Sequence, residues 1–200
     1  MKEITESGDA PVKVIMEAPG HLSYPCVFRH AGEWYMIPET GYARTVDLLR
    51  GDGFPLEWTK VTTLARGPTL VDTTPLWHEG AWYFFTTAEL DGGRKVNLLF
   101  VSDELTGPWR SHPCNPLSVD AAASRSAGQV VRHQGRMIRP VQDCTQAYGY
   151  AIVFCEILEL TPTSFRDRRI GRLDPDWHPG LRATHTWNRS GSLEVFDGRS

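Results

Sequence analysis

The sequence has no apolar run long enough to cross a membrane and no convincing amphipathic helix. A membrane-spanning helix needs roughly 20 consecutive apolar residues, and no stretch here approaches that length. The opening residues, MKEITESGDAPVKVIM, also lack the apolar segment of a secretory signal. We therefore expect a cytoplasmic protein that does not insert into a membrane.

Cysteine is scarce, and the formal charge is nearly balanced. The chain has four widely spaced cysteines without a CxxC pair: Cys26, Cys114, Cys144 and Cys155. Without an export signal, this spacing favours reduced thiols. The net charge is −3 and there is no basic stripe, so no nucleic-acid partner is expected. A Gly-rich phosphate loop, a GxSxG motif and a tight metal-ligand spacing are also missing, so we expect no cofactor and no metal.

What the sequence does contain is a repeated hairpin pattern. Each copy has a short apolar strand, a triplet that ends in Gly, and a second apolar strand. Gly accepts positive φ, so the pattern predicts a tight turn between two antiparallel strands. The copies are SYPCVFRHAGEWYMIPE from Ser23, DTTPLWHEGAWYFFTT from Asp72, SAGQVVRHQGRMIRPVQD from Ser126 and ATHTWNRSGSLEVFDG from Ala183. Their turn glycines, Gly32, Gly80, Gly135 and Gly191, are 48, 55 and 56 residues apart.

Other apolar segments between the hairpins predict further strands, at Val46–Leu49, Trp58–Thr63, Asn97–Ser102, Trp109–His112 and Ile152–Leu158. Up to four short antiparallel strands in a unit of about 50 residues is typical of a β-propeller blade. A β-sandwich also has many short strands, but the near-regular period disfavours it. We expect one all-β propeller domain over residues 1–200. Residues 1–18 are predicted to form a partial blade or a closing strand, with Val12–Met16 extended.

Four long motifs carry a family resemblance: HLSYPCVFRHAGEWYMIPET, LVDTTPLWHEGAWYFFTT, RPVQDCTQAYGYAI and THTWNRSGSLEVFDG. They resemble a bacterial family of five-bladed propellers related to glycoside hydrolase families 43 and 32. The same unit is similar to the N-terminal domain of plant glucosamine inositolphosphorylceramide transferases, and in some bacterial proteins it is joined to a formyltransferase-like domain. The resemblance covers about residues 19–198. It implies a five-bladed propeller whose first blade is missing or incomplete here.

Two departures from the hydrolase relatives concern the catalytic acids. The resemblance implies an earlier blade with an Asp-Pro-Phe motif, in which the Asp is catalytic, and this chain contains no such motif. The hydrolase-type Asp of the next inner strand is replaced by the stretch Ser23-Tyr24-Pro25. The resemblance therefore implies the fold more than hydrolytic activity.

Hairpin geometry predicts where a site would lie. The start of the first strand and the end of the second strand lie at the same end of a hairpin, and the inner strands of a propeller line its central channel. We therefore expect two sets of residues at one mouth of the channel. They are His21, Ser23, Tyr24, Asp72, Thr73, Thr74, Arg125, Ser126, His185 and Thr186 before the first strands, and Glu39, Thr40, Thr86, Thr87, Arg139, Gln142 and Asp143 after the second strands.

Within this set, three carboxylates are the candidate catalytic residues: Asp72, Glu39 and Asp143. Glycosidic hydrolysis uses two carboxyl groups that flank the scissile bond. We expect six other residues to bind the substrate: His21, Tyr24, Arg139, Gln142, His185 and Asn188. Tyr24, Tyr148 and Trp187 are aromatic candidates for stacking on a sugar.

Each candidate also has a structural interpretation, and the sequence leaves both open. Asp72 is a residue type that favours turns, and Glu39 could be a solvated acid at a strand end. Arg139 and Asp143 could form an ion pair between blades. His185 could be a buried histidine bonded to a backbone carbonyl.

Three functions compete at this point. The first is a carbohydrate-active enzyme, of glycoside hydrolase type or another type, that acts on a glycan or sugar conjugate. The second is a non-hydrolytic enzyme, such as a cyclase or lyase, in a biosynthetic pathway. The third is a sugar-binding or scaffolding module without catalysis. Expected partners are a small-molecule or glycan substrate and a second copy or partner domain that completes the propeller. Fold alone does not choose among them.

Overall fold

The computed structural model describes residues 13–200, which form strands joined by short connections. Within this range there is no α-helix. Two short 3-10 turns are present, η1 (Gly41–Ala43) and η2 (Asp91–Gly93). No helix in the same range is long and apolar enough to span a membrane. The predicted all-β class is therefore confirmed.

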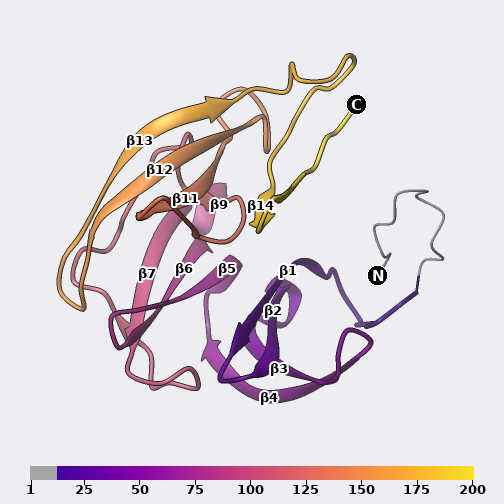
Figure 1. Cartoon of the computed structure of the whole chain (residues 1–200), viewed down its shortest axis with the longest axis vertical. Coiled ribbons are helices and arrows are strands. Elements are labelled where there is room, and N and C mark those ends of the chain that lie inside the picture. Colours follow the sequence, from indigo (N-terminus) through magenta and orange to yellow (C-terminus); the bar gives the residue numbers. More distant parts are fainter. Residues whose placement is uncertain (1–12) are drawn as a thin grey trace.

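The strands form four antiparallel sheets that follow one another around a common centre (Figure 1). The first sheet contains β1 (Ser23–His30), β2 (Glu33–Thr40), β3 (Thr45–Gly53) and β4 (Glu57–Arg66), in that order. The second contains β5 (Thr69–His78), β6 (Ala81–Glu89), β7 (Lys95–Ser102) and β8 (Arg110–Ser111), in that order. Each is an up-and-down meander, as expected for a propeller blade.

The third sheet has the order β10-β11-β12-β13, with β9 also paired to β11. Its strands are β9 (Arg125–Ser126), β10 (Val131–His133), β11 (Arg136–Asp143), β12 (Ala151–Leu160) and β13 (Phe165–Leu173). The fourth sheet has only two strands, β14 (Trp187–Ser190) and β15 (Leu193–Phe196). In Figure 1, strands β1, β5, β9 and β14 lie nearest the centre, and β4 and β13 lie at the periphery.

The hairpin turns explain how the repeated Gly acts. In the first three hairpins both turn residues have positive φ, and Gly is the second of them. Two positive φ values are the signature of a type I′ turn, whose twist matches that of the strands it joins. The fourth hairpin differs, because Ser190 pairs with Leu193 and Gly191 is therefore the first turn residue. The sequence triplet that ends in Gly looks the same as in the other hairpins, but its Gly stands one position earlier in the turn.

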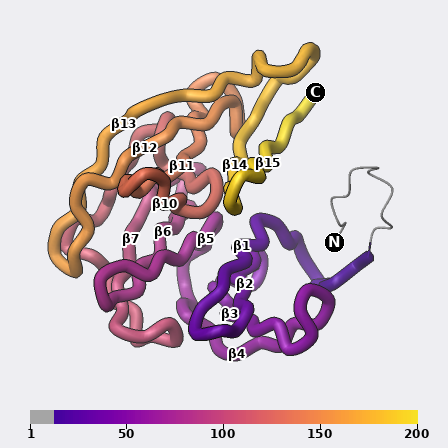
Figure 2. Tube along the Cα trace, viewed as in Figure 1, coloured from indigo at the N-terminus to yellow at the C-terminus, as the bar shows by residue number. Residues whose placement is uncertain are grey.

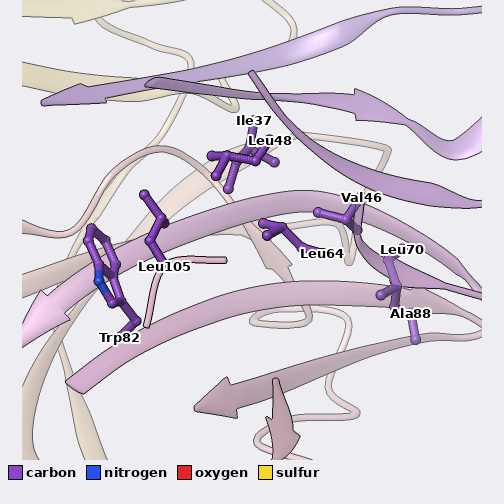
Figure 3. Packing of buried hydrophobic residues seen from close by; sticks show 8 residues of the cluster. All are labelled: Ile37, Val46, Leu48, Leu64, Leu70, Trp82, Ala88 and Leu105. Atoms are coloured by element: carbon purple, nitrogen blue, oxygen red, sulfur yellow. The ribbon is translucent and has the colours of Figure 1, made fainter. Parts of the chain in front are cut away.

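Apolar side chains pack between successive sheets. Between the first and second sheets they form one buried cluster (Figure 3), comprising Ile37, Val46, Leu48, Leu64, Leu70, Trp82, Ala88 and Leu105. A second cluster joins the second sheet to the third and includes Leu76, Phe85, Leu99, Ile157 and Leu160. Each large side chain buried in this way contributes about 1.5–3 kcal/mol. Burial between the sheets therefore fixes their order around the centre.

The fourth sheet is attached differently. Trp187 of β14 packs with Ala127, Val131 and Ile152 of the third-sheet region, and its backbone N–H donates to the carbonyl of Ala127 at 2.7 Å. The chain after β15 runs back beside residues 183–186, as the tube in Figure 2 shows, and Ala183 and Arg199 form an isolated bridge. This hairpin therefore rests on one small apolar cluster and its own hydrogen bonds.

Two sequence predictions about strands need correction. The strand predicted at Trp109–His112 is only Arg110–Ser111, because His112 turns inward and bonds to the Thr161 carbonyl. Residues 13–16 form no strand, and Val12 lies outside the described residues. The four cysteines are free thiols, as the sequence predicts, and Cys114 is exposed.

Gly128 permits a close approach between the third and fourth sheets. It has a φ of +138°, and a Cβ atom there would lie 1.9 Å from the carbonyl oxygen of Trp187. We predict that Gly128→Ala destabilises the fold by roughly 2–6 kcal/mol, the sum of overpacking and backbone strain. Urea denaturation would measure this.

Gly180→Ala is the matched control, since Gly180 also has positive φ (+86°) but a Cβ there would meet nothing within 4 Å. Its cost should be limited to backbone strain, about 1–3 kcal/mol. Equal losses in the two variants would contradict a role for close sheet approach at Gly128.

Candidate functional site

The inner strands of the first two sheets are irregular at equivalent places. In β1 the register shifts between Ser23 and Cys26, and in β5 it shifts between Val71 and Thr74. Each irregularity contains a non-glycine residue with positive φ, Tyr24 at 43° and Asp72 at 55°. Such conformations cost about 1–3 kcal/mol and cluster at functional sites. Asp72 thus occupies in the second blade the position that Tyr24 occupies in the first.

Asp72 is buried and paired with a cation from the next sheet. Its side chain accepts a hydrogen bond of 2.6 Å from Nε of Arg125 in β9. Only 3% of Asp72 and 6% of Arg125 are exposed. A buried carboxylate is tolerated only when it is paired and hydrogen-bonded, and Arg125 supplies both the charge and the hydrogen bond to Asp72.

Glu39 reaches the same place from the end of β2. Its carboxyl group lies next to Asp72, whose charge acts on it. Burial raises the pKa of Glu39, and the charge of Asp72 raises it further, although the charge of Arg125 opposes both. The surroundings of Glu39 therefore favour its protonated form over its ionised form.

A hollow of about 370 Å³ opens above these groups. We call it the mouth hollow, and its lining residues are His21, Ser23, Glu39, Gly41, Tyr42, Thr69, Val71, Glu89, Arg125 and Tyr148. Two aromatic rings, those of Tyr42 and Tyr148, remain about half exposed. The hollow thus combines a carboxyl group of raised pKa, a guanidinium and aromatic surface.

Tyr148 connects the mouth hollow to the fourth hairpin. The guanidinium carbon of Arg125 lies 4.9 Å from the Tyr148 ring centroid, and the ring of His185 lies 5.5 Å from the same ring. Nδ1 of His185 is paired with the carboxylate of Asp197. Although burial acts to raise the pKa of Asp197, hydrogen bonds from His185 and Thr186 hold it below the usual value.

Arg139 does not line the mouth hollow. It is buried, donates to Asp167 at 2.6 Å and to Asn97 at 3.2 Å, and lies 5.2 Å from the ring centroid of Phe85. Its neighbours belong to the second and third sheets. The interpretation as a residue that ties blades together fits this placement, but its partners are Asp167 and Asn97 rather than Asp143.

Asp143 and Gln142 are likewise engaged elsewhere. Asp143 pairs with Arg172 of β13 and accepts hydrogen bonds from the N–H and hydroxyl of Thr145, at 2.8 and 2.6 Å. Burial acts to raise the pKa of Asp143, but these bonds lower it overall. Gln142 is buried and donates to the Ser126 carbonyl at 2.8 Å. Neither lines the mouth hollow.

The remaining predicted residues divide between two hollows. His21 lines the mouth hollow, whereas Tyr24 and Asn188 line a second hollow of about 630 Å³ between β1 and the fourth hairpin. The Tyr24 hydroxyl bonds to Thr74 at 2.8 Å and accepts a bond from the Gly128 N–H. Burial raises the pKa of Tyr24 well above its usual value.

Trp187, predicted to stack on a sugar, is instead buried, with its ring centroid 5.1 Å from that of Phe154. Sequence reasoning placed Arg125 at the mouth but did not select it for a role, and it missed Tyr42 and Asp197. The setting of Arg125 in AAASRSAG was an available signal, because small neighbours let a long side chain be buried.

Within residues 13–200 no group of three or more His, Cys, Asp or Glu side chains is arranged to hold a metal ion.

The Asp72–Arg125 pair generates a stability prediction. Arg125→Met leaves Asp72 buried without its cation, so we expect a loss of about 3–5 kcal/mol. Adding Asp72→Asn should recover part of that loss, because the buried charge is then removed. Chemical denaturation of the single and double variants measures the coupling.

The exposed Arg110–Asp103 pair offers a matched control, and Arg110→Met should cost less than about 1 kcal/mol. If Arg125→Met costs no more than Arg110→Met, the pair does not stabilise the mouth.

Glu39 generates a pH-dependent prediction. Because its pKa is higher in the folded chain than in the unfolded chain, its stabilising contribution is complete below the unfolded pKa and is lost as the pH rises through the folded pKa. Glu39→Gln removes this dependence. The variant should therefore gain stability relative to the wild type as the pH is raised from about 4 to about 8.

Melting temperatures across that range would test this, with Glu104→Gln reporting the general effect of removing one exposed negative charge. A wild-type-to-Glu39→Gln difference that is constant with pH would refute the prediction.

Comparison with solved structures supports the propeller fold. A GH43_1 enzyme from Xanthomonas citri, complexed with xylotriose, is similar over 90% of this chain and 67% of its own, with a TM-score of 0.63 and 11% identity. A thermostable family-43 glycoside hydrolase is similar over 82% of this chain and 57% of its own, with a TM-score of 0.58 and 16% identity. At this identity the likeness shows the fold alone.

Plant relatives are more similar to this chain in sequence than these solved structures are. A glucosamine inositolphosphorylceramide transferase 1 from Oryza sativa subsp. japonica is 31% identical over 159 residues, and that from Arabidopsis thaliana is 30% identical over 162 residues. These matches cover 77% and 78% of this chain but only 21% of each relative, so the chain spans about a fifth of their length. The family described as glucosamine inositolphosphorylceramide transferase 1, N-terminal, matches residues 6–195, and the chain belongs to that family.

Proposed function

We propose that this propeller is a carbohydrate-active enzyme that acts on a sugar conjugate bound in the mouth hollow, with Glu39 as the proton donor. The observation that carries the proposal is the raised pKa of Glu39, which lines the hollow beside the buried Asp72. General acid catalysis of glycosidic bond cleavage uses a carboxyl group whose surroundings favour its protonated form.

The surrounding residues fit this role. Glu39 would give its proton to the oxygen of the leaving group as the glycosidic bond breaks. Asp72, held in place by Arg125, then lies beside the new Glu39 carboxylate, and repulsion between the two negative charges favours the return of a proton to Glu39. The half-exposed rings of Tyr42 and Tyr148 offer apolar surface to a sugar face.

The names of the relatives suggest the sugar class. The plant relatives are glucosamine inositolphosphorylceramide transferases, so we propose a glucosamine-type sugar conjugate as substrate. A transferase passes the sugar to a hydroxyl group, whereas a hydrolase passes it to water. Proton donation to the leaving group by Glu39 serves both reactions, and it is this shared step that we assign.

Leaving-group dependence tests Glu39 as the acid. A good leaving group, such as dinitrophenolate, departs without a proton, whereas an alkoxide does not. Glu39→Gln should therefore lower the rate on alkyl glucosaminides by about 10²–10⁴-fold and have a much smaller effect on dinitrophenyl glucosaminide. Glu104→Gln, which changes an exposed acid, is the control. Equal losses on both substrate types would show that Glu39 is not the proton donor.

A sugar-binding module without catalysis is the second candidate. It is favoured by the pairing of Asp143 with Arg172 and of Asp72 with Arg125, because each of these carboxylates already has a cationic partner. Two-carboxylate hydrolysis instead needs a separation of roughly 5–9.5 Å across the substrate. Calorimetric binding of glucosamine conjugates by a wild type that turns over none of them would favour this candidate over the enzyme.

A further inference from the structure

His185 and Asp197 form a hydrogen-bonded pair behind Tyr148, and neither of them lines the mouth hollow itself. One carboxylate oxygen of Asp197, Oδ1, accepts the backbone N–H groups of His185 and Thr186, at 2.8 and 2.6 Å. The other, Oδ2, faces Nδ1 of the His185 ring. The two backbone N–H groups thus hold the carboxylate through Oδ1, and its other oxygen, Oδ2, orients the imidazole.

This geometry fixes which ring nitrogen carries the hydrogen. A carboxylate can only accept, so Nδ1 of His185 must donate to Asp197. In the neutral imidazole, Nε2 is then the nitrogen with the free lone pair. Nε2 makes no hydrogen bond to any residue in the described range 13–200, and the side chain is 30% exposed. The ring therefore offers a proton acceptor to whatever lies next to it.

The ring of His185 lies next to Tyr148, which forms part of the wall of the mouth hollow. Tyr148, which lines the hollow, has its ring centroid 5.5 Å from that of His185. Gly149 makes this approach possible, because it has a φ of +60° and a Cβ atom there would lie 2.6 Å from Cβ of His185. The loop that carries Tyr148 is thereby packed directly onto the imidazole.

The carboxylates near the mouth have other partners. Asp72 is paired with Arg125, Asp143 with Arg172, and Glu89 with Lys95. Glu39 is the proton donor of the proposed function and cannot serve as the acceptor in the same step. A reaction at the mouth hollow still needs a group that takes the proton of the attacking hydroxyl.

We propose that His185 is this proton acceptor and that Asp197 is its positioning residue. The proposal rests on the proposed function of the mouth hollow. The oxygen of a water or sugar-conjugate hydroxyl forms a bond to the anomeric carbon, and its proton passes to Nε2 of His185. The bond from that carbon to the leaving-group oxygen breaks, and this oxygen takes the proton of Glu39. The imidazolium then returns its proton to solvent, and Glu39 takes one up.

The first experiment needs no substrate. Long-range ¹H–¹⁵N spectra of the labelled protein, recorded above the usual titration range of histidine, report which nitrogen carries the hydrogen. We expect Nδ1–H for His185 in the wild type and Nε2–H in Asp197→Asn, because the Asn amide donates where the carboxylate accepted. Asp103→Asn, which changes an exposed surface acid, should leave the wild-type pattern. A wild-type Nε2–H form, or an unchanged form in Asp197→Asn, would overturn the assignment.

The second experiment uses the alkyl glucosaminide of the previous section. Asp197→Asn should lower kcat at least about tenfold with KM changed less than about twofold, since orientation of a base affects the chemical step. Asp197→Glu should recover part of kcat. If Asp197→Asn does not fold, His185→Gln, which keeps the backbone contacts of Asp197, should show the same loss of kcat. A wild type inactive on every glycoside refutes the proposed function, whereas an active wild type with fully active Asp197 and His185 variants refutes only this inference.

Discussion

The burial of one carboxylate, that of Asp72, is the constraint on which the mouth of this propeller depends. A buried negative charge needs a cation, and Arg125 supplies it from the third sheet. Burial, and then the same charge, raise the pKa of Glu39, which arrives from the first sheet. Three successive sheets are therefore tied together at the place where the chemistry is proposed. The positive φ of Asp72 shows that the backbone accepts strain to hold the carboxylate there.

The fold could be predicted from the sequence because hairpin turns and strand periodicity are local properties. Gly32, Gly80 and Gly135 mark turns that need positive φ, and each lies where the pattern predicts. The fourth turn shows the limit of that approach, since Gly191 fits the pattern but sits one position earlier in its turn. The register depends on which residues pair across the hairpin, and the turn triplet alone does not specify that pairing. The number of blades in a closed ring stays a prediction.

The site was predictable only in part, because position along a hairpin indicates which end a residue occupies but not which neighbour it faces. Alternate side chains of a strand point to opposite faces, and Arg139 and Asp143 fall on a face where Asp167, Asn97 and Arg172 meet them. Glu39 and Asp72 converge because the C-terminal end of β2 lies beside the first half of β5. Arg125 resembles an exposed arginine in sequence, and only its environment shows that it is buried.

Because the fourth sheet has only two strands, the free energy needed to open the structure locally differs from one side of the mouth to the other. Glu39, Asp72 and Arg125 belong to sheets with large buried clusters on their faces, whereas His185 and Asp197 flank a hairpin whose outer strand, β15, is exposed at every residue. Proteins open in cooperative units, and units with few buried apolar contacts open at the lowest free energy. The amide hydrogens of β14 and β15 should therefore exchange with solvent before those of β5 and β6. A partial opening of this kind would separate His185 from Tyr148 while the rest of the chain stays folded, so the proposed activity would be lost at a lower temperature than the fold itself.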